Sequence, residues 1–507
     1  MTPKPKPSRM FKLALALWCL TLLIVLGARI LGPSDLGQNL DQSKTIAFTL
    51  DMVHNGEWVL PRDSLGRLSR KPPMVNWVGA PFVAMGWHSE LALKLPAVLS
   101  GIGIAVLVCF AGRFFYRRLD REAGDDADHW IASNAPAMGL LASAAWLASP
   151  SAVKHIYFMR PDILFAALLC SAWFASVVLL SSPERKRPGL ALLIWFLGAC
   201  AILTKGPLAV LVPMYLLAHI LVIVPKGQRR SAIKATGWWW GIPVMVLIPG
   251  LWLWGAYQVD PEHVRTALFG QELGGRVGNN GFAGILNAAM HNPGYFFERF
   301  LPWSLPAAMG IIFKPSAKIR THPLAPASLW ILLVLAITTL SSLSAGSYIM
   351  PAYPPAALLA VYVVFRLVAK SRATRIKPAI AVIVGLVMVS SSMIAGREAT
   401  RSRGARTGTG EHLKDFAHTA AQQVGTEAVV FSQMGDLPIA SLMGRFQAGE
   451  IELPEAHAWL IQPTQIDPNR EPVLTSDALV THDPKTGVPI DATITVSLYR
   501  IDSVSKP

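Results

Sequence analysis

The chain has 507 residues, of which 52% are hydrophobic and only 15% are charged. One soluble core cannot bury that much apolar surface, so the composition excludes an ordinary soluble protein and indicates an integral membrane protein. The formal net charge of +15 would suggest nucleic acid in a soluble protein, but here most cations lie in short loops between apolar segments, as topology signals or contacts to anionic lipid.

The N-terminal segment predicts an uncleaved signal anchor. Its first residues are basic, and the apolar run at 13–31 is long enough, at about 1.5 Å per residue, to cross a bilayer core of roughly 30 Å. A cleaved secretory signal has a shorter apolar region and a small-x-small site, of which Gly27-Ala28-Arg29 is a poor match. We expect this segment to stay as the first membrane span.

The next stretch, 33–73, predicts an outer loop that begins with an amphipathic helix. Apolar residues recur with helical spacing through 40–53, and Asn55-Gly56 is typical of the turn that ends such a helix. This pattern puts Asp41 at the helix N-terminus.

The end of the same loop brings a cation to the start of a second apolar helix. After a hairpin-like segment, Lys71 precedes Pro72-Pro73, and proline is tolerated in a helix only in the first turn. We therefore expect Asp41, Lys44 and Lys71 to gather where a lipid phosphate would lie.

Ten more hydrophobic segments follow the first, and together they predict an all-α polytopic membrane protein with about 11 to 13 transmembrane helices and juxtamembrane helices on the outer face. They lie near residues 92–116, 134–149, 161–182, 189–204, 207–224, 238–256, 294–313, 325–343, 348–368 and 378–395.

Basic residues assign the loops to sides of the membrane. With a cytoplasmic N-terminus, the clustered cations near 117, 185–187, 226–234, 314–320 and 370–377 all fall inside, as the positive-inside rule requires. The loops 32–91, 150–160 and 257–293 then share the outer side. An odd span count would also put the arginines at 397–406 outside, so either this late cluster is tolerated or the count is wrong by one.

The last part of the chain has the composition of a small soluble α/β domain. From about residue 408 a helix-period stretch is followed by strand-like segments at 428–431, 478–480 and 494–496. We predict a transmembrane domain at 1–396 and a periplasmic soluble domain at 397–507. All four cysteines fall in hydrophobic segments, so neither a zinc cluster nor a disulfide framework is expected.

A series of motifs recurs along the chain from the first outer loop onward. They are Asp41, Lys44, Gly56-Glu57-Trp58-Val59, Lys71-Pro72-Pro73, Trp77, Arg160-Pro161-Asp162, Leu203-Thr204-Lys205-Gly206-Pro207, Phe269-Gly270-Gln271-Glu272, Arg276, Leu301-Pro302-Trp303-Ser304 and Met350-Pro351-Ala352-Tyr353-Pro354-Pro355. In kind and order this series resembles the polyprenyl-phosphate-dependent GT-C glycosyltransferases, the group of bacterial aminoarabinose transferases and protein O-mannosyltransferases. The chain departs from the family where Gln42 stands in place of the usual Glu, and Lys44-Thr45 in place of Arg-Tyr.

The resemblance implies inverting transfer of a glycosyl group from an undecaprenyl or other polyprenyl phosphate to lipid A, a glycan or a protein at the periplasmic face of a bacterial inner membrane. It implies no metal, no other cofactor and no nucleic-acid partner. Asp41 and Asp162 are the implied catalytic residues. Asp41 would take the proton of an acceptor hydroxyl, or orient the sugar if the acceptor is itself a phosphate.

The other carboxylate, Asp162, lies in the first turn of its span because Pro161 takes the first helical position. There it would bind a hydroxyl of the donor sugar or hold a cation of the site. The alternative for Arg160-Pro161-Asp162 is an interfacial ion pair that caps the helix.

Four cations are candidates to bind the donor phosphate: Lys71, Arg276, Lys44 and Lys205. The planar fork of Arg276 suits a phosphate bidentately. Gly206-Pro207 predicts a helix break beside Lys205 at the outer surface, and a simple turn lysine is the alternative there.

Tyr348, Glu272 and His263 are candidates to contact the sugar or headgroup, against the alternatives of an aromatic belt and solvated loop charges. A transporter or lipid flippase is the competing function, but it should place ionisable residues near mid-span and show repeated halves. A non-catalytic scaffold is a third reading. The sequence names neither the sugar, the acceptor nor the oligomeric state.

Overall fold

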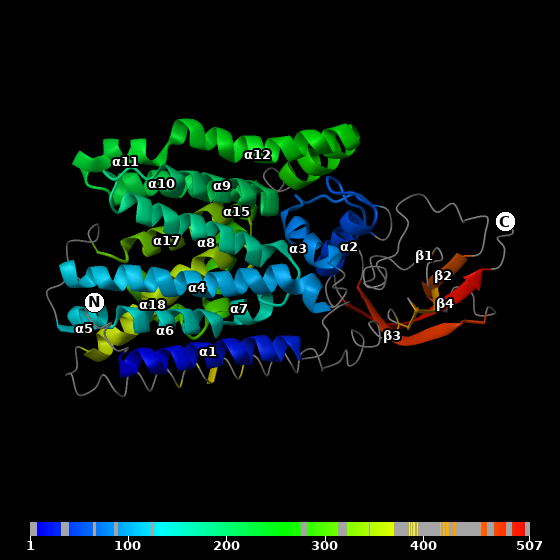
Figure 1. Cartoon of the computed structure of the whole chain (residues 1–507), viewed down its shortest axis with the longest axis horizontal. Helices are drawn as coiled ribbons and strands as arrows, with labels where there is room; N and C mark the ends of the chain where they lie inside the picture. Colours follow the sequence, from blue (N-terminus) through cyan, green and yellow to red (C-terminus); the bar gives the residue numbers. More distant parts are fainter. Residues whose placement is uncertain are drawn as a thin grey trace, which may run out of the picture.

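A computed structural model describes residues 8–31, 40–63, 67–85, 90–122, 126–274, 281–312, 322–343 and 345–369, isolated positions between 385 and 424, and the strand segments 429–431, 458–463, 471–482 and 489–501. Long helices form an elongated bundle, and a small sheet lies beyond one end of it (Figure 1). The predicted span at 378–395 and the arginines at 397–406 lie outside the described residues or at isolated positions.

The helices of the bundle follow the predicted hydrophobic segments. Six stretches of the described chain are long and apolar enough to cross a membrane, and one of them, Pro188–Val222, holds two predicted spans. The long elements are α1 (Arg9–Ile30), α4 (Glu90–Glu122), α8 (Pro161–Leu180), α9 (Pro188–Lys205), α10 (Leu211–Val222), α12 (Trp238–Val259) and α18 (Tyr353–Ala369), and the shorter apolar ones are α3 (Met74–Ala84), α6 (Ala135–Leu147) and α17 (Ala325–Leu340).

One predicted span is wrong. The segment at 294–313 is not a single helix, because α15 (Gly281–Phe300) ends before Pro302 and α16 (Ser304–Ile312) begins after it. Proline has no N–H to continue a helix, and the Ser304 hydroxyl instead donates to the Phe297 carbonyl at 3.0 Å. The outer loop predicted at 257–293 is also helical where it is described, as α13 (Pro261–His263), the π-helix η3 (Val264–Gly274) and the start of α15.

Short elements mark the two ends of the bundle. The N-terminus, α5 (Asp126–Ser133) and α11 (Arg229–Thr236) lie at one end, whereas α2 (Leu40–His54), α3 and α7 (Pro150–His155) lie toward the other (Figure 1). The basic segment at 226–234 is therefore at the opposite end from the first outer loop. The remaining short elements are the 3-10 helices η1 (Gly206–Val210), η2 (Lys226–Gln228) and η4 (Met350–Ala352).

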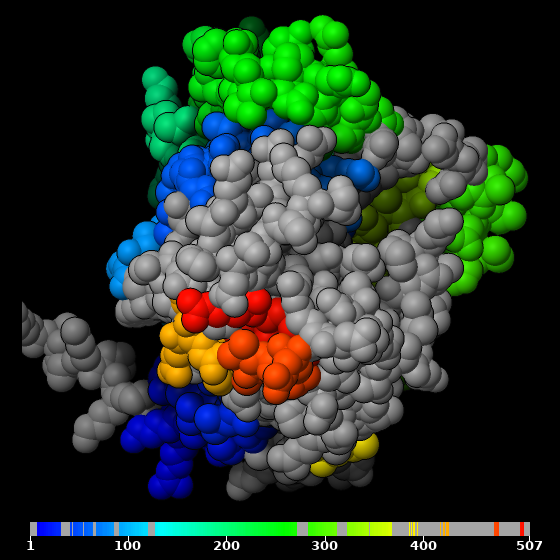
Figure 2. Space-filling view, turned by 90° about the vertical axis from the view of Figure 1, so that its right-hand side faces the viewer, coloured from blue at the N-terminus to red at the C-terminus, as the bar shows by residue number. Residues whose placement is uncertain are grey.

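Four strands form the sheet at the end that carries α2 and α3. Its order is β1-β2-β4-β3, with β1 parallel to β2 and the other pairs antiparallel. The predicted strands correspond to β1 (Val429–Phe431), β3 (Leu474–His482) and β4 (Pro489–Ile501), and β2 (Ala458–Pro463) was not predicted. Figure 2 looks onto this end and shows the orange and red strands beside the dark blue N-terminal helix. The boundary at 396 lies outside the described residues and stays a prediction.

Buried aromatic side chains pack α8, α10 and α17 against one another. Trp330 packs against Trp173 and Tyr215, and its indole N–H donates to the Pro351 carbonyl at 2.8 Å. Buried indoles and phenols pack well in an apolar core when their polar atom finds a partner. This contact fixes the broken segment before α18, next to Tyr348.

Small residues allow the closest approach between α4 and α6. A Cβ on Gly139 would overlap the Cys109 carbonyl oxygen, and one on Gly112 would lie 2.6 Å from the Gly139 Cα. Backbone atoms cannot move aside as a flexible side chain can, so the two helices need glycine here.

We expect Gly139→Ala to destabilise the bundle by about 1–3 kcal/mol, because the added methyl group forces α4 and α6 apart. Thermal unfolding in detergent should show a lower Tm. Gly103→Ala is the matched control on α4, since its Cβ would meet nothing within 4 Å. A Tm equal to that of the wild type for Gly139→Ala would contradict the close packing.

Candidate active site

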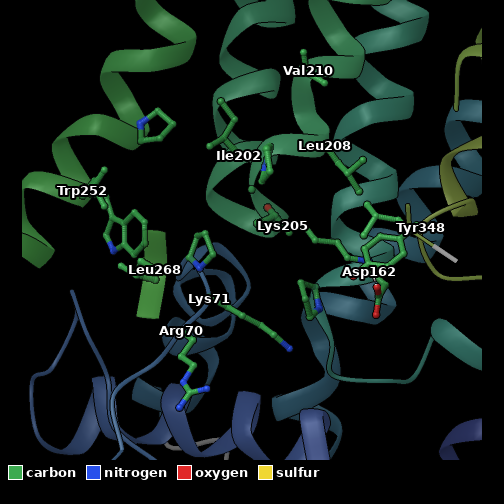
Figure 3. A pocket seen from close by; sticks show the side chains of 18 of the residues that line it. Arg70, Lys71, Asp162, Ile202, Lys205, Leu208, Val210, Trp252, Leu268 and Tyr348 are labelled. Atoms are coloured by element: carbon green, nitrogen blue, oxygen red, sulfur yellow. Dashed lines mark hydrogen bonds and ion pairs between the residues drawn. The ribbon is translucent and has the colours of Figure 1, made fainter. Parts of the chain in front are cut away.

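One pocket, with a volume of about 550 Å³, lies where the three predicted outer loops meet the ends of α8, α9 and α12 (Figure 3). It has a charged end and an apolar arm. The charged end is lined by Asp41, Arg70, Lys71, Arg160, Asp162 and Lys205, with Thr204, Ser341, Ser347 and Tyr348 beside them. The arm is lined by Ile202, Leu208, Val210, Val246, Pro249, Trp252, Leu253, Leu268 and Phe269.

Asp41 lies in the first turn of α2, as the sequence predicts, and forms two ion pairs. One oxygen is 3.1 Å from the Lys71 ammonium and the other is 3.1 Å from the Arg160 guanidinium. Burial alone would raise the pKa of Asp41, but these two cations outweigh burial and hold the pKa below its ordinary value. The side chain stays 44% exposed and faces the pocket as a carboxylate.

Asp162 is buried in the first turn of α8 and is also paired on both oxygens. Lys205 donates to Oδ1, and the Nε of Arg160 lies 3.1 Å from Oδ2. The Lys205 ammonium is also 4.0 Å from the centre of the Tyr348 ring. Figure 3 shows Lys205, Asp162 and Tyr348 together on one side of the pocket, opposite Trp252 and Leu268. The structure therefore brings these three predicted residues into one cluster.

Arg160 joins the two carboxylates, and the sequence analysis did not single it out. It is the N-cap of α8, and its extended backbone (φ −141°, ψ 156°) places the guanidinium between Asp41 and Asp162. The available signal was its place in the Arg-Pro-Asp motif, but sequence spacing does not show that a cap residue also reaches a carboxylate 119 positions earlier. Only the fold supplies that contact.

Below this cluster, a buried histidine adds no positive charge. His155, at the end of α7, pairs its Nδ1 with the Ser151 carbonyl at 2.8 Å. Burial lowers the pKa of His155 to about 4, although the nearby Asp162 opposes that shift. At neutral pH the imidazole is therefore uncharged.

Gln42, which stands where the family usually has Glu, is fully buried rather than in the pocket lining. Its Oε1 accepts a hydrogen bond from the Met159 N–H at 2.9 Å. The amide thus ties α2 to the turn that presents Arg160. A structural role accounts for this residue without a second carboxylate.

Hydrogen bonds within the first outer loop fix the position of Lys71. An isolated bridge between Arg62 and Leu68 confirms the predicted hairpin-like segment. The Ser69 hydroxyl donates to the Lys71 carbonyl at 3.0 Å and accepts from the Lys71 N–H at 3.3 Å. The resulting turn holds Arg70 and Lys71 at the edge of the pocket.

Two side chains, one from α12 and one from the segment that follows it, support the first outer loop. Trp252 of α12 donates to the Val59 carbonyl at 3.0 Å, and the His263 Nε2 pairs with the Ser69 carbonyl at 3.0 Å. His263, predicted as a headgroup contact, is thus not among the lining residues but braces the turn that carries Lys71.

The remaining predicted phosphate and sugar contacts are only partly described. Lys44 is on α2 but is not among the lining residues, and burial together with the nearby Arg67 lowers the pKa of Lys44. Glu272 lies in η3 with a side chain outside the described atoms, and Arg276 lies outside the described residues. Among the described residues, no group of three or more His, Cys, Asp or Glu side chains could hold a metal ion.

The charge and shape of the pocket suit an amphipathic anion. Its described lining has four cations against two carboxylates, an excess of two positive charges. The apolar arm runs from this end between η1 and α12, where Val210 and Val246 are 42% and 59% exposed. An anionic head beside an apolar chain is the chemistry that such a lining recognises.

Known proteins share limited sequence similarity with this chain. No family model matches the sequence. The undecaprenyl phosphate-alpha-4-amino-4-deoxy-L-arabinose arabinosyl transferase of Shewanella sediminis is 22% identical over 328 residues, which cover 63% of this chain and 54% of that protein. The chain thus spans about half the length of this curated relative.

Two solved structures share the fold over most of the chain. ArnT from Cupriavidus metallidurans bound to undecaprenyl phosphate has a TM-score of 0.63 at 17% identity, covering 96% of this chain and 97% of that chain. The archaeal oligosaccharyltransferase AglB from Archaeoglobus fulgidus, in complex with an inhibitory peptide and a dolichol-phosphate, has a TM-score of 0.51 at 12% identity, covering 88% and 65%. The chain is therefore a multi-pass membrane protein with the fold of the GT-C glycosyltransferase superfamily.

Proposed function

We propose that this protein is a glycosyltransferase that takes a sugar from a polyprenyl phosphate, undecaprenyl phosphate in a bacterial membrane. The observation that carries the proposal is the pocket itself, in which a cation-rich end adjoins an apolar arm. The relatives support it, since one is named for an undecaprenyl phosphate sugar and two neighbours were solved with polyprenyl phosphates of this kind.

In the proposed reaction, the polyprenyl chain lies along the arm and the donor phosphate lies at the charged end. An acceptor oxygen attacks the anomeric carbon with inversion, the bond from that carbon to the phosphate oxygen breaks, and its electron pair leaves with the phosphate. The phosphate thereby gains a negative charge. Lys71, Arg160 and Lys205 stabilise that charge more in the transition state than in the ground state, with no metal ion required.

The carboxylates have different roles in this proposal. Asp41 is exposed to the pocket and accepts a hydrogen bond from the acceptor hydroxyl, whose proton it takes as the new bond forms. If the acceptor is a phosphate, no proton has to leave and Asp41 orients the sugar. Asp162 is buried and positions Lys205 and Arg160. A lowered pKa makes Asp41 a weak base, which favours proton transfer late in the reaction.

The test uses the purified full chain in proteoliposomes with a radiolabelled polyprenyl phosphate sugar, and mass spectrometry of lipid A, glycans and envelope proteins from cells with and without the protein. We expect one of these three classes of acceptor to lack a glycosyl group in the deletion strain. Expression of the Asp41→Asn variant in that strain should not restore the group. Movement of the lipid across the bilayer without cleavage of the sugar–phosphate bond would instead favour the flippase alternative.

We predict that the pocket faces the periplasm. In a background without the four native cysteines, Thr266→Cys on η3 should react with an impermeant maleimide in cells with a permeable outer membrane. Gln228→Cys, at the basic end of the bundle, should react only after lysis. Both positions are exposed. Labelling of Gln228→Cys alone in intact cells would contradict this prediction and indicate the opposite topology.

We predict that Lys71→Gln raises the free-energy barrier to turnover by roughly 2–4 kcal/mol. The substitution should also change the pH dependence of activity. Without the Lys71 ammonium, burial of Asp41 is opposed mainly by Arg160, so the pKa of Asp41 rises. Activity that requires ionised Asp41 is lost as the pH falls through that pKa. The acid limb of kcat/KM should therefore move to higher pH in the variant.

Lys44→Gln is the matched control for this experiment, because Lys44 belongs to the same loop but is not among the lining residues. We expect a smaller loss of turnover and a smaller shift of the acid limb. If Lys71→Gln only raises the KM for the lipid donor and leaves the acid limb in place, Lys71 binds ground state and transition state equally.

A further inference from the structure

Arg70 is a fourth cation of the pocket, and the proposed reaction does not use it. It lines the pocket and precedes Lys71 in the sequence. In Figure 3 its guanidinium lies on the side away from Lys205 and Tyr348.

The backbone around Arg70 is fixed on both sides. Ser69 is buried, donates its N–H to the Pro61 carbonyl at 2.8 Å and offers its own carbonyl to His263. The Ser69 hydroxyl also closes the turn onto Lys71. An arginine on an unconstrained loop is usually only solvated, but this one is held at the edge of the pocket by four hydrogen bonds to its two neighbours.

The carboxylates of the pocket do not offset the charge of Arg70. Both oxygens of Asp41 are paired, with Lys71 and Arg160, and both oxygens of Asp162 are paired, with Lys205 and Arg160. Among the described lining residues, every carboxylate oxygen already faces a protein cation, with which an ammonium group on a ligand would have to compete. A donor phosphodiester carries one negative charge, which leaves the excess of two positive charges only partly neutralised.

We propose that Arg70 determines donor specificity, so that the site selects a polyprenyl phosphate whose sugar carries no positive charge and disfavours an amino sugar. The inference rests on the proposed function and names the class of donor. With the donor phosphate near Lys71, the sugar lies next to Arg70. The Arg70 side chain is exposed, but its backbone is held at the edge of the pocket, so an ammonium group there would meet a guanidinium of like charge, which repels it. The named donor of the Shewanella relative, by contrast, carries a 4-amino group.

The experiment measures binding, so it does not need the acceptor. The full chain in nanodiscs is loaded with radiolabelled undecaprenyl phosphate, which is displaced by two synthetic donors on the same lipid, one with a neutral pentose and one with a 4-amino-4-deoxypentose. We expect the neutral donor to bind at least about tenfold more tightly (~1.4 kcal/mol) at a pH where the amine is protonated. The preference should disappear at a pH above the pKa of the sugar amine.

Variants of the arginine assign the effect. Arg70→Glu should shift the ratio of affinities at least about tenfold toward the amino donor, whereas Arg70→Lys should retain the preference of the wild type. Arg265→Glu is the matched control, an exposed arginine of η3 in the 257–293 segment that is not among the lining residues and instead donates to the Tyr257 hydroxyl at 2.8 Å. It should leave the ratio unchanged.

Two results would overturn the inference: equal or tighter binding of the amino donor by the wild type, or the same ratio in Arg70→Glu as in the wild type. Failure of the proposed function would look different. In that case undecaprenyl phosphate itself would not bind, or neither donor would displace it.

Discussion

The contact on which the rest of the site depends is the Arg160 guanidinium between Asp41 and Asp162. A carboxylate as buried as Asp162 costs several kcal/mol unless it is paired and hydrogen-bonded. Lys205 donates a hydrogen bond to one oxygen of Asp162, Arg160 forms an ion pair with the other, and Arg160 also forms an ion pair with Asp41. Three segments far apart in the sequence must be in place before any of these charges is tolerated, so the site and the junction of the loops form as one unit.

The same junction explains how a pocket can have two kinds of lining. The first outer loop supplies charges and is held by Trp252 and His263, which belong to α12 and the segment after it. Because α12 is braced at this end, its apolar side chains stand beside η1 and form the arm of the pocket. The charged and the apolar lining of the pocket thereby lie on opposite sides of one contact between a loop and a helix.

Sequence patterns predicted the parts of this structure that depend on periodicity. Hydrophobic runs located the spans, and a proline at the first helical position placed Asp162 correctly. Side-chain direction was not predictable in the same way: His263 turned to a backbone carbonyl, and the bridging role of Arg160 needed the fold. Pro302 divides an apolar run that hydropathy reads as continuous, and β2 came from a segment whose mixed composition gives no clear alternation.

Gln42 shows how the charge of the site is set by a residue outside it. Its amide oxygen accepts the Met159 N–H, a bond that a carboxylate would also accept, so the turn before Arg160 keeps its shape while one negative charge is absent. A buried carboxylate at that position would need a cation as a partner, whereas Lys71 and Arg160 are already paired with Asp41. With a neutral amide instead, both cations remain with Asp41 and the pocket. In the proposed function, the excess positive charge of the pocket thus depends on this neutral amide as well as on the arginines and lysines that line the pocket.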